Sequence, residues 1–301
     1  MLSNFMKGTI FAFLTGLGTV GNIFVSVNYV LIFAGTEKKS IHLLLIHLAA
    51  TNIITLLSMG MPSTIAAFGV RNFLDDIGCK IVAYLERVAR GLSLCTSSLL
   101  TVVQAVTVSP RHSKWRKLKP RSAWYILPLC LFFWILNSSV GMNLLLYITS
   151  TSMNTSKGSV NGNTCRFRPG NQKIKWTFLI IMLIRDVMFL GVMGGASGYL
   201  LFLLHRHHQR VLFLQTSKSL YNAPPEIKAA QSVLLLMLCF VFFYWTDCVF
   251  SLLINTFMES NSILLNIRNF ITLGYAIVSP FVLIHRDRHL TECWRQSLRR
   301  C

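Results

Sequence analysis

The sequence is short of charged residues, and acidic side chains are the scarcest of them. Charged residues make up 13% of the 301-residue chain, with 10 Asp and Glu against 29 Lys and Arg. A soluble globular domain carries about 25% charged residues. This deficit, with a hydrophobic content of 53%, excludes a soluble protein and indicates one that crosses a membrane. The formal charge of +19 therefore bears on which side of the membrane each loop lies, and we expect no nucleic acid partner.

Motifs that carry catalysis or hold cofactors are also lacking. The chain contains no HExxH, no glycine-rich phosphate loop and no pair of CxxC motifs. The last apolar stretch, residues 269–285, has no lysine that could hold retinal. We expect no enzyme activity, no metal and no cofactor. Internal repeats of the kind found in transporters are lacking as well.

Long apolar stretches account for most of the chain. A helix needs about 20 mostly apolar residues to cross a hydrocarbon core of about 30 Å. We therefore predict an all-α membrane protein, with residues 1–301 forming a single seven-transmembrane helix bundle that ends in a short cytoplasmic tail at 285–301. The predicted spans cover residues 8–35, 41–69, 79–108, 122–149, 175–204, 228–257 and 264–284.

The basic residues suggest which side of the membrane each loop occupies. With the N-terminus outside, the inner loops and tail hold roughly twice as many Lys and Arg as the outer ones, as the positive-inside rule requires. This orientation places the glycosylation sequon at Asn154 outside, together with Cys79 and Cys165. We expect a Cys79–Cys165 disulfide, because such bonds persist in that compartment. The alternatives are a chance sequon and two free thiols.

Ionisable residues inside the predicted spans are few and concentrated in spans three, five and six. Such groups face the bundle interior and mark functional sites by default. We expect an outward-facing ligand pocket between spans three, five, six and seven. Its candidate residues are Tyr84, Glu86, Arg87, Arg90, Arg185, Tyr244 and Asp247. The alternative is that these charges only neutralise one another between helices.

Local spacing gives more specific expectations for these residues. Glu86 and Arg90 are four residues apart, so they share a helix face and are expected to pair. Asp186 follows Arg185 directly and is expected to point in another direction. Gly191, Gly194, Gly195 and Gly198 form a small-residue stripe that predicts close helix packing.

The inner surface is dense in basic residues, most of them in the second inner loop. Contact with anionic lipid head groups and docking of a cytosolic partner with an acidic surface both explain this density. The candidate contact residues are Arg111, Lys114, Trp115, Arg116, Lys117, Arg206, Arg210 and Arg286. His205, His207 and His208 lie among these basic residues, so we interpret them as part of a basic helix end and not as a metal site.

Several segments resemble one receptor family. They are Gly21-Asn22, residues 47–52 (HLAATN), residues 99–115 (LLTVVQAVTVSPRHSKW), the sequon before Cys165-Arg166, and residues 279–287 (SPFVLIHRD). These cover nearly the whole chain and resemble the vomeronasal type 1 receptors, which are pheromone receptors coupled to G proteins. The chain departs from rhodopsin-like receptors: it reads Thr107-Val108-Ser109 in place of an acidic-Arg-Tyr triplet, and Asn52 in place of the sodium-binding Asp.

The resemblance implies a function. It implies a chemosensory receptor in the plasma membrane that binds a small pheromone-like ligand and activates a heterotrimeric G protein of the inhibitory Gi/Go type. The alternatives are a bitter-taste-like receptor and, from another class, a small-solute transporter or channel. The residues of the expected pocket suit a sulfated steroid, an amine or a neutral volatile, so the sequence leaves the ligand open.

Overall fold

The computed structural model forms a bundle of long helices. It describes residues 2–35, 39–68, 75–110, 123–150, 165–167, 172–214, 225–257 and 262–286. The helices are α1 (Leu2–Ala34), α2 (Ser40–Thr55), the π-helical turn η1 (Leu56–Gly60), α3 (Met61–Ala67), α4 (Asp76–Val108), the 3-10 turn η3 (Ala123–Tyr125), α5 (Leu127–Tyr147), α6 (Gln172–Leu214), α7 (Pro225–Phe257) and α8 (Ser262–Arg286).

Within the described residues, six helical segments are long and apolar enough to cross a membrane. Five belong to α1, α4, α6, α7 and α8, and the sixth runs through α2, η1 and α3 as one span. Helix α5 has 21 residues, of which Leu127–Met142 form the apolar part with described side chains. Each of these helices overlaps one of the predicted spans.

The second span is interrupted by the π-helical turn η1. A π-turn inserts one extra residue per turn and often bends a helix. Here Gly60 ends η1 beside α1, and a side chain on Gly60 would collide with Thr15. Pro62 follows within the first turn of α3, where its missing N–H removes one hydrogen bond from the continuing helix.

Helix α4 is the centre of the bundle. It contacts α2, α5, α6 and α7, and its membrane segment is the most buried of the six. Its N-terminus is capped by Asp75, whose Oδ1 accepts a hydrogen bond from the backbone N–H of Gly78 at 2.7 Å. Because α4 touches so many neighbours, it can carry a buried polar face that would be costly against lipid.

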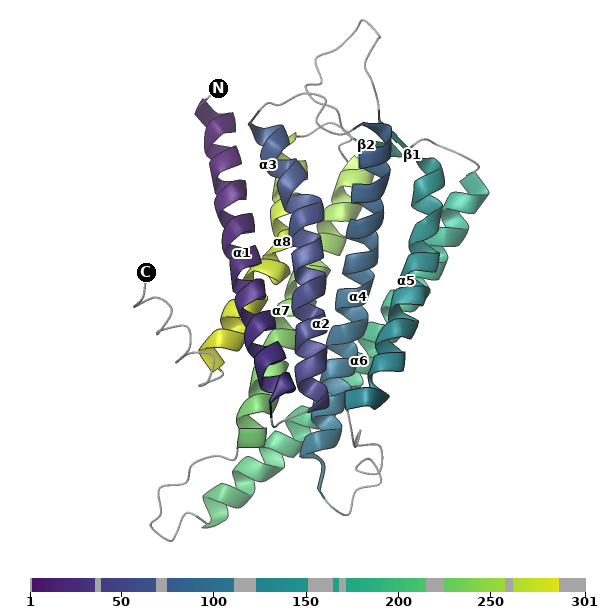
Figure 1. The fold of residues 1–301 in the computed structure, drawn as a ribbon. Coiled ribbons are helices and arrows are strands. Elements are labelled where there is room, and N and C mark those ends of the chain that lie inside the picture. The colour runs from purple at the N-terminus through teal and green to yellow at the C-terminus, as the bar shows by residue number, and fades with distance from the viewer. Residues whose placement is uncertain are drawn as a thin grey trace, which may run out of the picture.

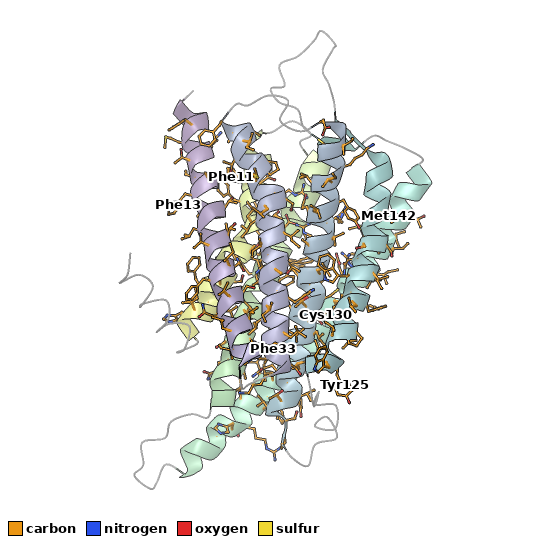
Figure 2. All side chains as sticks on the ribbon, in the orientation of Figure 1. Phe11, Phe13, Phe33, Tyr125, Cys130 and Met142 are labelled. Atoms are coloured by element: carbon orange, nitrogen blue, oxygen red, sulfur yellow. The ribbon has the colours of Figure 1, made fainter. Side chains whose placement is uncertain are left out.

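Apolar side chains cover the outside of the bundle as well as its core. Phe11 on α1 is 2% exposed and faces the neighbouring helices, whereas Phe13 is 66% exposed. Figure 2 shows Phe13 and, on α5, Met142 projecting outward from the bundle. An apolar outer surface is what a hydrocarbon environment requires.

Two short strands lie beside the end of α4. β1 (Ile148–Ser150) and β2 (Cys165–Phe167) pair antiparallel, with Ser150 opposite Cys165, and both contact α4. The N-terminal end of α1 lies at the same end of the bundle as these strands (Figure 1). At the opposite end α6 projects beyond the other helices, because it continues for ten residues past its predicted end at residue 204.

Candidate functional site

A cavity of about 50 Å³ lies between four helices. Its walls come from α2, α4, α7 and α8, whereas we expected spans three, five, six and seven. Helix α6 contributes no residue to this lining, and α2 takes its place. The lining residues are Asn52, Thr55, Glu86, Arg90, Ser93, Phe240, Phe243, Tyr244, Asp247, Ile271, Thr272, Tyr275 and Ala276.

Asp247 is the buried centre of the charged part of the site. Its Oδ2 accepts a hydrogen bond from Arg90 Nη2, and its Oδ1 accepts one from Thr272 Oγ1 at 2.6 Å. The Nε of Arg268 lies 3.6 Å from the same Oδ1. One carboxylate that is 2% exposed therefore joins α4, α7 and α8. Such a carboxylate is tolerated in a low-dielectric interior because it is paired and hydrogen-bonded.

The pairing of Arg90 differs from the one expected from local spacing. We expected Glu86 on the same helix, yet among the described side chains the ion-pair partner of Arg90 is Asp247 on α7. Glu86 lines the cavity one turn above Arg90 and forms no ion pair with any described residue. Arg90 pairs with Asp247 because a neighbouring cation stabilises the deeply buried carboxylate of Asp247 more than the half-exposed carboxylate of Glu86.

A second polar network lies beside the cavity and involves Arg185 and Asp186. Arg185, 5% exposed, donates from Nη1 to Asn137 Oδ1 at 2.8 Å. It also donates from Nε and Nη2 to Asp186 Oδ1 at 2.8 and 2.6 Å. The expectation that these neighbours point apart was wrong, because the arginine side chain is long enough to fold back. The network connects α5 with α6.

Tyr244 links the two networks. It lines the cavity, and its hydroxyl donates a hydrogen bond to Asp186 Oδ2 at 2.5 Å. Asp247 lies three residues further along the same face of α7. A change in the packing of the cavity can therefore reach α6 through one side chain.

Of the seven predicted ligand residues, the structure brings four to the cavity: Glu86, Arg90, Tyr244 and Asp247. Tyr84 packs instead against Val88 and faces Gly141 on α5. Arg87 is half-buried on α4 outside the lining, and Arg185 is enclosed by its own network.

Sequence reasoning missed most of the uncharged lining. The spacing of Glu86, Arg90 and Ser93 follows one helix face and could have identified Ser93. Arg268 gave a comparable signal on α8, because Thr272 and Tyr275 follow it by four and seven residues on one helix face.

Close packing holds α4 against this region. A Cβ on Gly91 would overlap Asn137 Oδ1 and lie 2.7 Å from Arg185 Nη1, so only glycine fits. The predicted packing of the α6 stripe was wrong for this chain: Gly191, Gly194 and Gly198 have no atom within 4 Å of an added Cβ. That stripe faces away from the bundle.

A neutral polar cluster lies below the cavity. Asn52 Nδ2 donates to Asn22 Oδ1 at 3.2 Å and to Ser279 Oγ at 2.8 Å. Asn22 Nδ2 in turn donates to the carbonyl oxygens of Gly18 and Ala276, both at 2.8 Å. The cluster joins α1, α2 and α8 through uncharged groups. It includes Asn52, which stands where rhodopsin-like receptors carry a sodium-binding Asp.

His47 forms a further junction between helices. Trp134 Nε1 donates to His47 Nε2 at 2.9 Å, which makes Nε2 the acceptor. Nδ1 then carries the proton and donates to Thr96 Oγ1, also at 2.9 Å; this tautomer is assigned from the hydrogen-bond pattern. A single ring therefore joins α2 to α4 and α5.

At the other end of α4, Ser109 contacts α6. Its Oγ lies within hydrogen-bond distance of the carbonyl oxygen of Ala105, at 2.9 Å, and of the hydroxyl of Tyr199, at 3.1 Å. This contact between α4 and α6 is therefore made by uncharged groups.

Cys79 is buried and disulfide-bonded. Cys165 begins β2, which contacts α4. This placement agrees with the expected Cys79–Cys165 bond, which stays a prediction because the side chains of β2 are outside the described part of the chain.

The structure describes only some of the residues predicted for the inner surface. Arg206 is exposed on the projecting part of α6. Arg210 and Arg286 belong to helices, but their side chains are outside the description. The remaining predicted residues, which lie outside the described residues altogether, are Arg111, Lys114, Trp115, Arg116, Lys117 and the sequon residue Asn154.

Comparison with known proteins identifies the family. The family model of the vomeronasal organ pheromone receptors matches residues 5–296. The chain is 36% identical to the vomeronasal type-1 receptor 4 of Homo sapiens over 91% of both chains. It is 32% identical to the vomeronasal type-1 receptor 51 of Mus musculus, over 93% of this chain and 88% of the relative.

A fish relative extends the comparison. The olfactory receptor class A-like protein 1 of Danio rerio is 31% identical over 95% of this chain and 90% of its own length. These relatives are receptors and not enzymes, which agrees with the expectation of no catalysis. The chain is a multi-pass membrane protein and belongs to the vomeronasal type-1 receptor family, a family of chemosensory receptors.

Proposed function

We propose that this receptor resides in the plasma membrane with its N-terminus outside and crosses the bilayer seven times, with α5 as the fourth span along the chain. It binds a small pheromone-like ligand from outside and activates a heterotrimeric G protein of the Gi/Go type. The positive-inside bias and the sequon at Asn154 support this orientation. The family match supports the pheromone-receptor role.

The observation that carries the proposal is the junction at Asp247. It ties α4, α7 and α8 together at the wall of a cavity. A ligand changes a two-state equilibrium only if it interacts differently with the two states. A ligand that replaces part of the Asp247 junction does so, because the junction holds one helix arrangement and its loss releases α7 and α8.

The signal would then reach the inner side through two routes. Tyr244 connects the cavity with Asp186 on α6. Ser109 connects the inner end of α4 with the same helix. Helix α6 projects from the bundle at that end and exposes Arg206, which is suited to an acidic cytosolic surface or to anionic lipid head groups.

The proposal is tested by ligand-evoked signalling. Cells that express the receptor with a Gi-type protein are screened with a library of small volatiles, amines and steroid sulfates. Any active compound is then titrated on Arg90→Ala and Asp247→Ala, with Trp245→Leu as the control, because Trp245 is 70% exposed on the outer side of α7. Surface expression is matched.

We expect both cavity variants to shift the potency and the control to leave it unchanged. Unchanged potency in both would remove the cavity from the mechanism. Ligand-driven current or uptake in liposomes without a G protein would instead favour a transporter or channel.

A further inference from the structure

We infer that the cavity is built for a small amine, with the ammonium group held by Glu86 and a second polar group of the ligand held by Ser93. The inference rests on the proposed function only in taking this cavity as the ligand site.

Glu86 is the one charged lining residue that forms no hydrogen bond or ion pair with another described residue, although Arg87 and Arg90 lie near enough to interact with it electrostatically. Both oxygens of Asp247 are occupied, one by Arg90 and the other by Thr272 with Arg268 nearby. Arg90 is in turn committed to Asp247. Glu86 has no hydrogen bond or ion pair with any described side chain, so its carboxylate is open toward the cavity.

The arrangement of the charges also favours a cation over an anion. Two carboxylates and one guanidinium line the cavity, and a second guanidinium, that of Arg268, pairs with Asp247. An anionic ligand would face Glu86 and Asp247 and could reach Arg90 only by displacing a buried ion pair. A protonated amine meets the carboxylate of Glu86, which forms no ion pair with a described residue, and leaves the Asp247 ion pairs in place.

Ser93 supplies the second contact. Its side chain is 6% exposed, and its Oγ lacks a hydrogen-bond partner among the described residues although it lines the cavity. A buried hydroxyl without a partner is unfavourable, so a ligand that bonds to it gains affinity. Ser93 follows Glu86 by seven residues, which places both on one face of α4, about 10 Å apart along the axis. A short chain with a polar group at each end matches this spacing.

The remaining wall suits the same ligand. Phe240, Phe243, Tyr244 and Tyr275 line the cavity, and aromatic faces attract ammonium groups. The volume of about 50 Å³ equals roughly four water molecules at about 10–15 Å³ each. This favours a short alkyl amine over a bulky polycyclic ligand.

The test uses four probes with one five-carbon skeleton: 5-aminopentan-1-ol, pentylamine, pentan-1-ol and 5-hydroxypentanoate. Binding to purified full-length receptor is measured by the rise in melting temperature, without a G protein. Each probe is titrated to about 10 mM, because ligands of this size bind weakly. The variants are Glu86→Gln and Ser93→Ala, with Leu85→Ala as the control, since Leu85 is 37% exposed beside Glu86.

We expect 5-aminopentan-1-ol to bind most tightly, pentylamine next, and the alcohol and the anion at least tenfold more weakly. Glu86→Gln should weaken both amines by about tenfold or more, as expected for a hydrogen bond to a charged group. Ser93→Ala should weaken only 5-aminopentan-1-ol, to the affinity of pentylamine, and the control should match the native receptor.

Several outcomes overturn the inference. These are no binding of either amine, equal binding of the anion, or amine affinity within twofold of native in Glu86→Gln. If Glu86→Gln does not yield folded receptor, the ranking of the probes and the Ser93→Ala result decide. G-protein activation by some other ligand, with no amine binding, would leave the proposed function intact and refute the amine. Amine binding without activation of any G protein would support the amine and refute the proposed function.

Discussion

Replacing Asp247 with asparagine should loosen the bundle. The variant keeps the size of the side chain and removes its charge. The amide oxygen of the new side chain can still accept from Thr272, but Arg90 and Arg268 lose the buried carboxylate that pairs with them. Breaking one buried pair costs about 3–5 kcal/mol. The Arg90 side chain is 23% exposed and that of Arg268 is 31% exposed, so both regain some hydration, and we expect a loss of about 2 kcal/mol, in the range for a charged hydrogen bond.

This loss has two measurable consequences. The melting temperature of purified receptor should fall by about 5 °C, taking about 2–4 °C per kcal/mol from soluble domains of comparable size. If the junction holds the inactive arrangement, basal nucleotide exchange on a Gi protein should rise by about tenfold or more, since about 1.4 kcal/mol corresponds to a factor of ten. Trp245→Leu is the control on the same helix.

A double-mutant cycle separates the pair from general damage. Arg90→Gln should be destabilising alone, and the combination with Asp247→Asn should be less damaging than the sum by about 1 kcal/mol or more. Additive losses, or an Asp247→Asn receptor that melts with the native protein, would refute the assignment of Asp247 as the junction between α4, α7 and α8.

Three further predictions concern other contacts. Gly91→Ala should lower the melting temperature by several degrees because its Cβ overlaps neighbouring polar atoms, whereas Gly194→Ala, in open space, should leave it unchanged; equal melting of the two would contradict the packing. Tyr244→Phe removes the hydroxyl bonded to Asp186, and should cost about 1.5–3 kcal/mol of stability as a charged hydrogen bond, measured by thermal unfolding; a loss below about 0.5 kcal/mol would show the bond to be dispensable. Ser109→Ala removes a neutral contact between α4 and α6 and should raise basal nucleotide exchange severalfold, with exchange at the native level as the contrary result.

The sequence predicted the helices better than it predicted their pairings. Runs of apolar residues located each long helix, because the bilayer imposes a minimum length on any span. The embedded charges also marked α4 and α7, which line the cavity, whereas α6, marked in the same way, contributes no residue to the lining. Arg90 nevertheless pairs with Asp247, 157 positions away in the sequence, and local spacing carries no information on such a contact.

The glycines also show that local sequence does not indicate which helices come into contact. Gly91 is isolated in the sequence and yet lies in the tightest contact of the site, whereas the conspicuous stripe beginning at Gly191 touches nothing in the described part of this chain. Small residues permit close approach, but which helix approaches depends on how the whole bundle is arranged. Thr272 and Tyr275 were missed because their own side chains are uncharged, although Arg268 lies on the same face of α8.

A receptor needs a stationary part against which the rest can move, and the imidazole of His47 indicates where that part lies. Both of its ring nitrogens are engaged by different helices, so α2, α4 and α5 form one mechanical unit. The ion pair that joins α7 to α4 at the cavity depends instead on the single carboxylate of Asp247, whereas α8 is also tied to this frame through Asn52–Ser279 and Ser97–Tyr275. Ligand binding would therefore move α7 against a fixed three-helix frame, and labels for distance measurements are best placed with one on α7 and one on the frame.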